Sequence, residues 1–378
     1  MSMPSHDSNA LFEPFRINGL ELPNRVVMAP MTRNFSPGNV PGEQVAAYYR
    51  RRAEGGTGLI ITEGTCVNHP AASAYENVPF FYGDAALAGW RRVVEAVHAA
   101  GGKIAPQLWH VGAMRGIGAP GAVIDPFPDT PAFTPSGLLM PGREHGHAMT
   151  QTDIDAVVAA FAQGAADAQR LGFDAVEIHG AHGYLIDQFF WEGTNRRSDG
   201  YGGSIANRTR FAAEIVAASR ARVGPEFPII LRFSQWKLQD YRARLVTSPT
   251  ELESFLAPLA KAGVDVFHCS TRRFWEPEFP DSDLNLAGWT RKITGRPSIA
   301  VGSISLDQDF IDEERRNIGT HAEPASLRNL DDLLARGDFD LVAVGRSLIP
   351  NPDWPKLIAA GRANELRAYD KSDLDTLV

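Results

Sequence analysis

Eight short apolar runs recur along the chain, and patterns typical of helices separate them. Each run is almost continuously apolar, as expected of parallel strands that are buried on both faces. The helical patterns carry their own boundary signals: a capping box with Pro249 at the first helical position starts at Ser248, and Gly263 ends that helix. The predicted strands cover residues 26–30, 58–62, 104–109, 174–179, 228–233, 264–269, 297–301 and 340–344.

The alternation of eight strands with helices favours one closed barrel. A chain of 378 residues could hold two or three domains of average size. However, (β/α)8 barrels run from about 200 to over 400 residues when insertions are included. We therefore expect an α/β fold that forms a single (β/α)8 TIM barrel domain over residues 1–378. An open doubly wound sheet is the alternative, because strand order cannot be read from the sequence.

Two stretches fall outside the barrel repeat. Residues 1–25 precede the first predicted strand, and we expect them to form an N-terminal extension. The third and fourth strands start at 104 and 174, whereas a minimal βαβ unit needs roughly 30 residues. The surplus lies in residues 111–150, which are rich in Gly, Pro and polar residues, and we expect a capping insertion beside the active site.

Composition and charge exclude several classes of function. The chain has 44% hydrophobic residues, 22% charged residues and a formal net charge of −8. The negative charge argues against nucleic acid or an anionic membrane as the main partner. The sequence shows neither a signal peptide nor an apolar run of membrane-spanning length, so we expect a cytoplasmic protein. Cys66 and Cys269 form no CxxC motif, so any redox chemistry needs an organic cofactor.

The end of the fourth predicted strand is the most unusual site in the sequence. In such a barrel the catalytic groups lie at the carboxyl ends of the strands. His179, His182 and Tyr184 fall within six residues there. The histidines could be hydrogen-bonded core residues or metal ligands, but the spacing supplies no third ligand, and we expect no metal. Gln107 on the third strand could simply satisfy a buried backbone group, and only its position beside the histidines favours a functional interpretation.

The last two strands end in glycine followed by a polar residue. These pairs are Gly302-Ser303 and Gly345-Arg346. Loops after strands seven and eight of such barrels commonly bind phosphate through backbone N–H groups, and Arg346 would add a charged partner. Either loop alone could be an ordinary surface turn, but the two together favour a phosphate site. A GxGxxG dinucleotide motif is absent after the strands.

Several motifs are distributed over nearly the whole chain. The longest is Asn-Arg-Arg-Ser-Asp-Gly-Tyr-Gly-Gly-Ser at 195–204, followed by Asn207-Arg208. The others lie at 11–15, 24–33, 62–64, 107–110, 179–184, 187–190, 345–349 and 351–353. Together they resemble the Old Yellow Enzyme family of FMN-dependent ene-reductases, whose members are (β/α)8 barrels.

The resemblance implies a cofactor, a donor and a substrate class. It implies bound FMN, NADPH or NADH as the hydride donor, and an α,β-unsaturated carbonyl compound as the substrate of a monomer or homodimer. It also implies that His179 and His182 bind the substrate carbonyl oxygen and that Tyr184 supplies the proton. The FMN-binding residues that it implies are Pro30, Met31, Thr32, Gly64, Gln107, Arg232, Gly302, Ser303, Gly345 and Arg346. As candidates for the substrate pocket wall we take Tyr75, Trp109, Phe274 and Trp275, although each could equally be packing residues.

Some segments depart from the family pattern. His182 stands where some relatives have Asn, and residues 306–325 are longer and more charged than the usual connection after the seventh strand. Residues 233–237 and 274–275 also differ, which leaves the substrate preference open. A metal-dependent hydrolase that uses the histidine pair and a non-catalytic FMN-binding barrel are the alternative functions.

Overall fold

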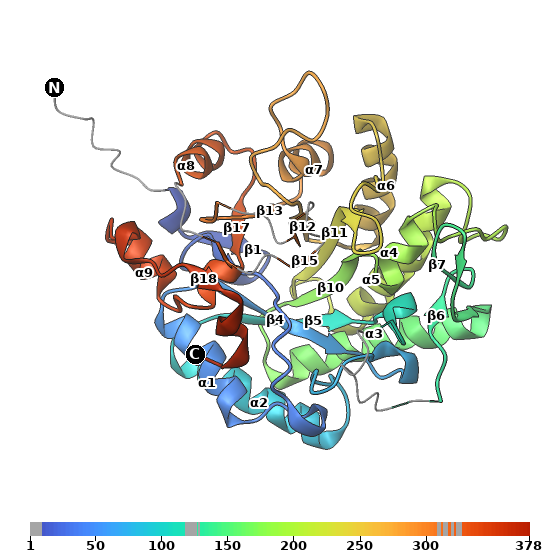
Figure 1. Ribbon diagram of the computed structural model, residues 1–378, viewed down its shortest axis with the longest axis horizontal. Helices are drawn as coiled ribbons and strands as arrows, with labels where there is room; N and C mark the ends of the chain where they lie inside the picture. Colours follow the sequence, from blue (N-terminus) through green and yellow to red (C-terminus); the bar gives the residue numbers. More distant parts are fainter. Residues whose placement is uncertain are drawn as a thin grey trace.

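The computed structural model describes residues 10–117, 127, 129–307, 311–312, 317–318, 321–322 and 327–378. Its centre is a closed barrel of parallel strands whose spatial order follows their order in the chain (Figure 1). This closure confirms the predicted (β/α)8 barrel and excludes the open doubly wound sheet. The barrel strands are β3 (Val26–Met28), β4 (Leu59–Cys66), β5 (Ile104–Trp109), β10 (Val176–His182), β11 (Ile229–Lys237), β12 (Val266–Ser270), β13 (Ser298–Val301) and β17 (Leu341–Val344).

Helices surround the barrel and separate its strands in the sequence (Figure 1). At α6 the predicted N-cap and C-terminal glycine are confirmed: the Ser248 hydroxyl accepts a hydrogen bond from the Glu251 N–H at 3.3 Å, and Gly263 takes a left-handed conformation at φ 116°. The Glu251 carboxylate accepts from the Thr247 N–H instead of the Ser248 N–H, so only half of the predicted capping box forms. The longer helices are α1 (Glu43–Glu54), α2 (Asp84–Ala99), α3 (Gln151–Leu171), α5 (Ile205–Val223), α6 (Pro249–Ala262), α7 (Leu286–Thr294) and α8 (Arg328–Ala335), and two shorter ones are α4 (Leu185–Phe190) and α9 (Trp354–Ala359).

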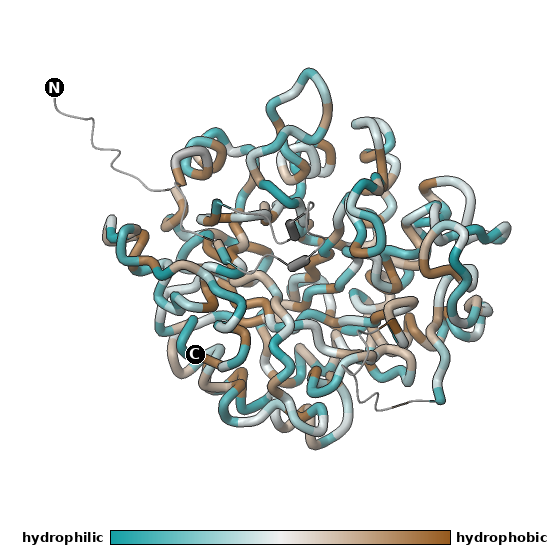
Figure 2. Tube along the Cα trace, viewed as in Figure 1, coloured by the Kyte–Doolittle hydropathy of each residue, from teal (hydrophilic) through white to brown (hydrophobic). Residues whose placement is uncertain are grey.

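Apolar residues of the described ranges pack inside the barrel and between the barrel and its helices, and a small third cluster joins Leu306 and Ile349 to Tyr369 of the C-terminal segment. The interior cluster includes Val27, Ile61 and Ile230, and the β1–β2 hairpin (Phe15–Ile17 and Leu20–Leu22) packs against it. The larger cluster joins strand residues to helix residues such as Trp90. Figure 2 shows hydrophobic and hydrophilic positions alternating along the outer helices, as expected when one helix face packs on the barrel.

Three strands continue three or four residues beyond their predicted ends, and β12 continues by one residue to Ser270. β4 runs to Cys66, β10 to His182 and β11 to Lys237. The register shifts between Ile61 and Gly64 on β4 and between Gly180 and His182 on β10. Polar residues beyond the apolar runs therefore still belong to the barrel, because strand pairing and not hydrophobicity decides where these strands end.

The two predicted additions to the barrel are described only in part. Residues 1–9 of the N-terminal extension and residues 118–126 and 128 of the predicted capping insertion lie outside the described residues. Within the insertion, β6 (Phe133–Thr134) pairs with β9 (His147–Ala148), and β7 (Leu138–Met140) pairs with β8 (Arg143–Glu144). The capping role itself stays a prediction.

The segment after β13 was predicted from its length and charge to be an insertion at 306–325. Residues 308–310, 313–316, 319–320 and 323–326 lie outside the described residues. Short strands lie between them: β14 (Ile311–Asp312) pairs with β15 (Asn317–Ile318), and β16 (His321–Ala322) pairs with β18 (Tyr369–Asp370).

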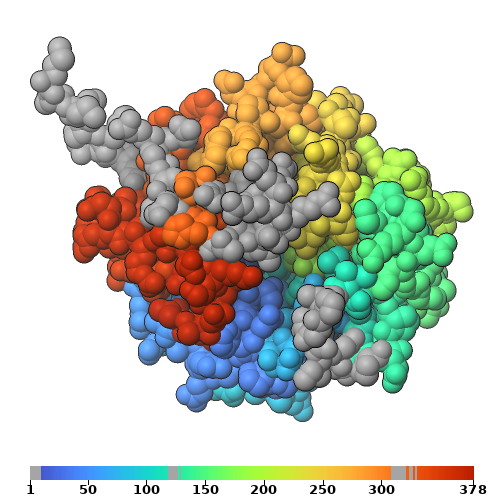
Figure 3. Space-filling view, viewed as in Figure 1, coloured from blue at the N-terminus to red at the C-terminus, as the bar shows by residue number. Residues whose placement is uncertain are grey.

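The end of the chain returns to the start of the barrel. The C-terminal segment lies beside α1 (Figures 1 and 3). The Arg51 guanidinium donates a hydrogen bond to the Leu377 carbonyl at 2.5 Å, and Arg33 donates one to the Thr376 carbonyl at 2.6 Å. Among the described residues, no helix combines the length and the apolar character needed to cross a membrane.

Candidate active site

A cavity of about 410 Å³ lies at the carboxyl ends of the barrel strands. Each barrel strand, or the loop that follows it, contributes residues to its lining, and the C-terminal residues Tyr369 and Leu374 complete it. This end of the barrel is where TIM-barrel active sites are found. The barrel therefore brings residues that are distant in sequence around one space.

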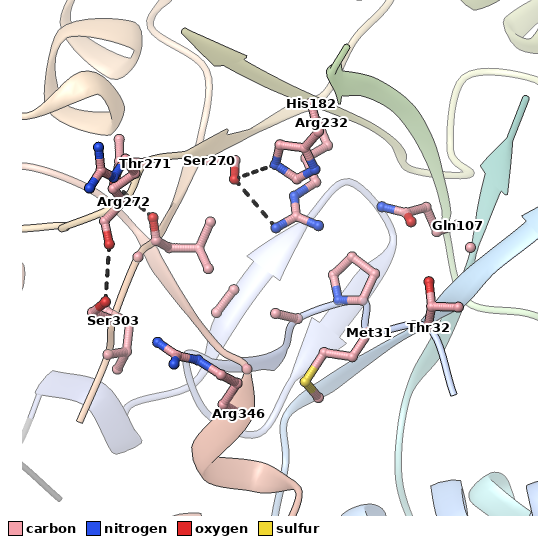
Figure 4. Close-up of a pocket in the computed structure, with 18 of the residues that line it drawn as sticks. Met31, Thr32, Gln107, His182, Arg232, Ser270, Thr271, Arg272, Ser303 and Arg346 are labelled. Atoms are coloured by element: carbon pink, nitrogen blue, oxygen red, sulfur yellow. Dashed lines mark hydrogen bonds between the residues drawn. The ribbon is translucent and has the colours of Figure 1, made fainter. Parts of the chain in front are cut away.

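All the residues that the sequence assigned to FMN line this cavity. They come from β3, β4, β13 and β17, or the loops that follow these strands, on one half of the barrel and from β5 and β11 on the other, and Figure 4 shows several of them around one open space. The residues are Pro30, Met31, Thr32, Gly64, Gln107, Arg232, Gly302, Ser303, Gly345 and Arg346.

Two positions of the cavity lining are occupied by glycine for different physical reasons. A Cβ on Gly64 would lie 2.6 Å from Trp109 Cε3, so glycine is needed there for the close packing of the indole. A Cβ on Gly345 would meet only Ala29 and Met31, both at 3.8 Å. The missing side chain at Gly345 relieves no clash, and it keeps a cradle open at the end of β17. Such a cradle beside the Arg346 guanidinium suits a phosphate.

Arg232 on β11 is a buried cation that faces the cavity. Its terminal nitrogen lies 3.5 Å from the Ser270 hydroxyl, and its Nε donates to no acceptor among the described residues. Burial lowers the pKa of Arg232 to about 10, against the opposing effect of Glu177, so the guanidinium is charged at neutral pH. A buried charge with an unused donor is costly unless an electron-rich group fills the cavity. The pyrimidine edge of a reduced flavin is such a group, and this site fits it.

Gln107 is oriented by a carboxylate behind it. Its Nε2 donates to Glu177 Oε1 at 2.8 Å, while Glu177 Oε2 lies 2.7 Å from His268 Nδ1. A carboxylate can only accept, so the amide nitrogen of Gln107 is committed to Glu177. Burial lowers the pKa of His268, so a neutral imidazole donates from Nδ1. Gln107 is thus a fixed part of the site and not a residue that merely satisfies backbone.

The side chains of His179, His182 and Tyr184 meet at one end of the cavity. The ring centroids are 5.3 Å apart between the two histidines and 5.1 Å apart between His179 and Tyr184. His179 Nδ1 accepts from the Ala181 N–H at 3.3 Å, so its proton resides on Nε2. His182 Nε2 lies 2.8 Å from the Ser270 hydroxyl (Figure 4).

Burial decides the protonation of these three groups. It lowers the pKa of His179 and of His182 well below the usual value, and nearby Arg232 adds to this effect. It raises the pKa of Tyr184 well above the usual value. At neutral pH the site therefore presents neutral imidazoles and a protonated phenol. Neutral imidazoles can donate one hydrogen bond each, and the phenol can donate a proton.

A family of known proteins matches the chain over most of its length. The model of the NADH:flavin oxidoreductase / NADH oxidase family matches residues 10–365. The chain belongs to this family. It is similar to 12-oxophytodienoate reductase 1 from Oryza sativa subsp. japonica, with 33% identity over 367 residues that cover 97% of this chain and 90% of the relative. The match covers 94% of this chain but only 52% of an NADH oxidase from Thermoanaerobacter brockii, and 57% of this chain and 56% of 12-oxophytodienoate reductase 7 from Oryza sativa subsp. japonica.

Solved structures of similar proteins share the barrel. Morphinone reductase has a TM-score of 0.77 and 32% identity, covering 99% of this chain and 94% of that one. An Old Yellow Enzyme homologue from Zymomonas mobilis has a TM-score of 0.75 and 26% identity, covering 93% of each chain. These similarities confirm the resemblance to the Old Yellow Enzyme family and the enzyme class: the chain is an NAD(P)H-dependent flavin oxidoreductase that uses FMN.

Only one of the four candidates for the pocket wall lines the cavity. Trp109 lines the cavity, but Tyr75, Phe274 and Trp275 are not part of its lining. Tyr75 stacks on Trp109 with 5.6 Å between ring centroids. Phe274 packs into the core, and Trp275 is 38% exposed. The chain turns away after Thr271 and Arg272, so those two residues reach the cavity instead.

Several lining residues were not anticipated from the sequence. Ser270 ends β12, and Thr271 and Arg272 directly follow it, so the rule that strand ends carry the site could have found them. Trp236 stacks on His182 at 4.4 Å between centroids, and Tyr241 stacks on Trp236 at 5.2 Å. These aromatic residues lie on or after the unpredicted extension of β11. No local spacing rule points to the C-terminal lining residues.

Among the described residues, no group of three His, Cys, Asp or Glu side chains is arranged to hold a metal ion. The histidine pair has other partners: His179 accepts from backbone and His182 contacts Ser270. The chemistry of these side chains therefore suits hydrogen bonding to an oxygen atom that enters the cavity.

Proposed function

We propose that this protein is an ene-reductase that reduces the carbon–carbon double bond of α,β-unsaturated carbonyl compounds. The observation that carries the proposal is the convergence of His179, His182 and Tyr184 on the cavity that the FMN candidates line. When bound, FMN accepts hydride from NADPH or NADH and donates it to the β-carbon of the substrate. The protein supplies binding, orientation and charge.

The FMN is proposed to be held at opposite ends by different groups. Gly302, Ser303, Gly345 and Arg346 would hold its phosphate, where backbone N–H groups and a guanidinium converge. Arg232 would offset negative charge on the pyrimidine side, which gives its unused Nε a partner. The Gln107 amide and the backbone around Gly64, together with the neighbouring residues 30–32, would contact the ring system.

His179 and His182 would bind the substrate carbonyl oxygen. Both imidazoles are neutral because burial lowers their pKa values, so each has one N–H to donate. Hydrogen bonds to that oxygen stabilise the negative charge that develops as hydride adds to the β-carbon. Because the donors are already in place on β10, little reorganisation is needed when the charge forms.

Tyr184 would donate the proton to the α-carbon. Burial raises its pKa, which keeps the phenol protonated until the carbanion-like carbon draws the proton away. The ring lies beside His179 and is edge-on to Trp109 at 4.8 Å between centroids, so its position is restricted. A positioned general acid contributes roughly 10²–10⁴-fold to a rate.

The names of similar proteins support a small carbonyl substrate. One relative is called a 12-oxophytodienoate reductase and one solved structure a morphinone reductase. Trp109 would form part of the substrate wall, with Tyr75 behind it. The division into one FMN-binding domain over 1–378, with an extension at 1–25 and a cap at 111–150, remains part of the proposal, as does a monomeric or homodimeric state.

A spectroscopic titration tests the proposal. The purified protein should be yellow, and NADPH added under argon should bleach its flavin absorbance. Addition of 2-cyclohexenone should then restore the absorbance and yield cyclohexanone. A colourless protein that contains zinc would support the hydrolase alternative. Bound FMN that NADPH does not reduce would support a non-catalytic barrel, and a reduced flavin that the enone leaves reduced would refute the substrate class.

A further inference from the structure

A buried ion pair lies behind the turn that carries His182 and Tyr184. Lys237 Nζ is 2.7 Å from Asp187 Oδ1, and both side chains are 0% exposed. Lys237 also donates to the Ser234 carbonyl at 3.1 Å. The proposed reaction uses neither charge. A buried pair of this kind often stabilises a fold no more than apolar residues would. Its contribution here is the geometry that it fixes.

The second oxygen of Asp187 holds the turn itself. Asp187 Oδ2 accepts a hydrogen bond from the Gly183 N–H at 2.6 Å. Asp187 lies on α4 and Lys237 at the end of β11. One carboxylate therefore links the strand extension, the short helix and the turn. Burial raises the pKa of Asp187 and the Lys237 ammonium opposes this rise, so the negative charge of Asp187 depends on Lys237.

The turn needs such restraint because its backbone is strained. His182 has φ 64°, in the left-handed region that residues with a side chain rarely adopt, and Gly183 follows with φ 78°. The extension of β11 holds this conformation from one side. Ser234 Oγ accepts from the His182 N–H at 2.9 Å, and the Leu238 N–H donates to the His182 carbonyl at 3.3 Å.

The peptide groups of Gly183 are held on both sides. Gln188 Nε2 and Gln239 Nε2 donate to the Gly183 carbonyl at 2.6 Å and 2.8 Å, while Asp187 accepts from its N–H. Gly183 has φ 78°, which residues with a side chain rarely adopt, and a Cβ there would also displace Gln239 Oε1, 1.8 Å away, so glycine is favoured at this position. Gly183 separates His182 from Tyr184, so the orientation of its peptide groups determines the directions in which both side chains leave the backbone.

Lys237 can act on this turn only through other residues. Its strand neighbours Trp236 and Leu238 line the cavity, but Lys237 does not, because alternate strand residues point to opposite sides. We propose that Lys237 is a positioning residue for Tyr184 and His182: its ammonium pairs with Asp187 in the core and fixes that carboxylate, and Asp187 holds the strained turn that directs both side chains into the cavity. This inference rests on the proposed function of those two residues.

Two variants and a matched control test the inference. Lys237→Met leaves Asp187 buried without its cation. Lys237→Met/Asp187→Asn removes both charges but retains a side-chain oxygen that can accept from the Gly183 N–H. Lys103→Met is the control, since it removes the ammonium of the Lys103–Asp174 pair, 3.1 Å apart at the opposite end of the barrel strands. Each holoenzyme is studied by stopped flow, with NADPH for flavin reduction and 2-cyclohexenone for reoxidation, and by titration with a phenol.

The inference predicts different effects on the two half-reactions. In Lys237→Met, reduction by NADPH should stay near the wild-type rate, reoxidation by the enone should slow by about 10–100-fold, and the phenol should bind more weakly. The double variant should recover most of the reoxidation rate and phenol affinity. Lys103→Met should resemble the wild type in every assay. A merely structural role would instead slow both half-reactions alike.

The inference is overturned if Lys237→Met reoxidises at the wild-type rate, if both half-reactions slow equally, or if the double variant stays as slow as the single one. If Lys237→Met does not fold, the double variant is compared with the wild type. The inference then requires both half-reactions of the double variant to be near the wild-type rates, and it is overturned if reoxidation is slow. Tyr184→Phe is measured in parallel. If that variant keeps the wild-type enone rate, the proposed acid is wrong, and Lys237 is then judged by phenol affinity through His182 alone, where an unchanged affinity in Lys237→Met overturns it.

Discussion

On the side of the cavity formed by β3, β4 and β17, the lining residues lie on their strands or follow them directly. On the side formed by β10 and β11, His182, Tyr184 and Trp236 lie on a strained turn and a strand extension. Gly345 comes immediately after β17 and Gly64 lies within β4. By contrast, His182 takes φ 64° and depends on hydrogen bonds from another strand. The first side is set by the barrel alone, and the second needs contacts between distant segments.

This difference assigns separate tasks to the two sides in the proposed function. The regular side, together with Gln107 on β5 and Arg232 on β11, would hold FMN, which stays bound through every cycle. The strained side would meet a substrate that enters and leaves, and its donors must point at one small oxygen atom. Variants on the regular side should therefore change FMN binding or stability, and variants on the strained side should change the oxidative half-reaction.

The largest effect is expected at Tyr184 on the strained side. Tyr184→Phe should leave reduction by NADPH nearly intact and slow reoxidation by 2-cyclohexenone by roughly 10²–10⁴-fold, the usual contribution of a positioned general acid. The rate of reoxidation by quinones should fall less, because quinones take up electrons without protonation at carbon. Stopped-flow measurement of both half-reactions checks this. Equal losses in the two half-reactions would remove Tyr184 as the acid.

Glu63 should control the pH dependence of stability on the regular side. It is buried on β4 and accepts from the Arg33 N–H at 2.9 Å, and burial raises its pKa to about 7. The folded state therefore binds a proton more tightly than the unfolded state, so the free energy of unfolding should fall as the pH rises from about 4.5 to about 7. The full loss is about 3 kcal/mol for this single group.

Glu63→Gln should remove that dependence while its side-chain oxygen still accepts from Arg33. Denaturant unfolding of both proteins between these pH values checks the prediction. The variant should gain stability relative to the wild type as the pH rises. A constant difference between the two proteins would show that Glu63 does not titrate in this range.

Arg346 should affect FMN retention and not the enone chemistry. Arg346→Ala removes a charge-assisted contact worth roughly 1.5–3 kcal/mol, so FMN should bind about 10–150-fold more weakly. The dissociation constant of FMN from the apoprotein, followed by flavin fluorescence, measures this change. Once saturated with FMN, the variant should reoxidise with the enone at the wild-type rate. Stoichiometric FMN in the purified variant would contradict the phosphate assignment.

The smallest effect is expected for single histidine variants. Phenols should bind the oxidised enzyme and produce a long-wavelength charge-transfer band, because two donors meet one oxygen. His179→Ala and His182→Ala should each weaken phenol binding by about tenfold, as expected for the loss of one hydrogen bond to a charged oxygen. Absorbance titration gives the affinity. Unchanged affinity in both variants would place the pair outside the substrate site.

The sequence predicted the regular side better than the strained side, and the reason is physical. Strand ends in a barrel converge on one face, so Thr32, Gly64 and Gly345 could be placed together before their contacts were known. Trp236 was missed because β11 continues beyond its apolar run through pairing with its neighbours.

Long-range contacts explain the remaining errors of placement. Tyr369 and Leu374 reach the cavity from the C-terminal segment. Hydrogen bonds donated by Arg33 hold this segment against the start of the barrel. Phe274 was a candidate for the pocket wall or for packing, and it packs in the core. Apolar side chains near a strand end can turn either way, and only tertiary packing decides between them.

A crystal structure of the FMN-loaded protein with a bound phenol tests the central claim most directly. The account predicts FMN against Arg232 and the Gly345 loop, and the phenol oxygen within about 3.2 Å of nitrogen atoms of both His179 and His182. Tyr184 should lie on the side of the phenol away from the flavin. A phenol bound elsewhere, or a metal ion held between the histidines, would contradict the account.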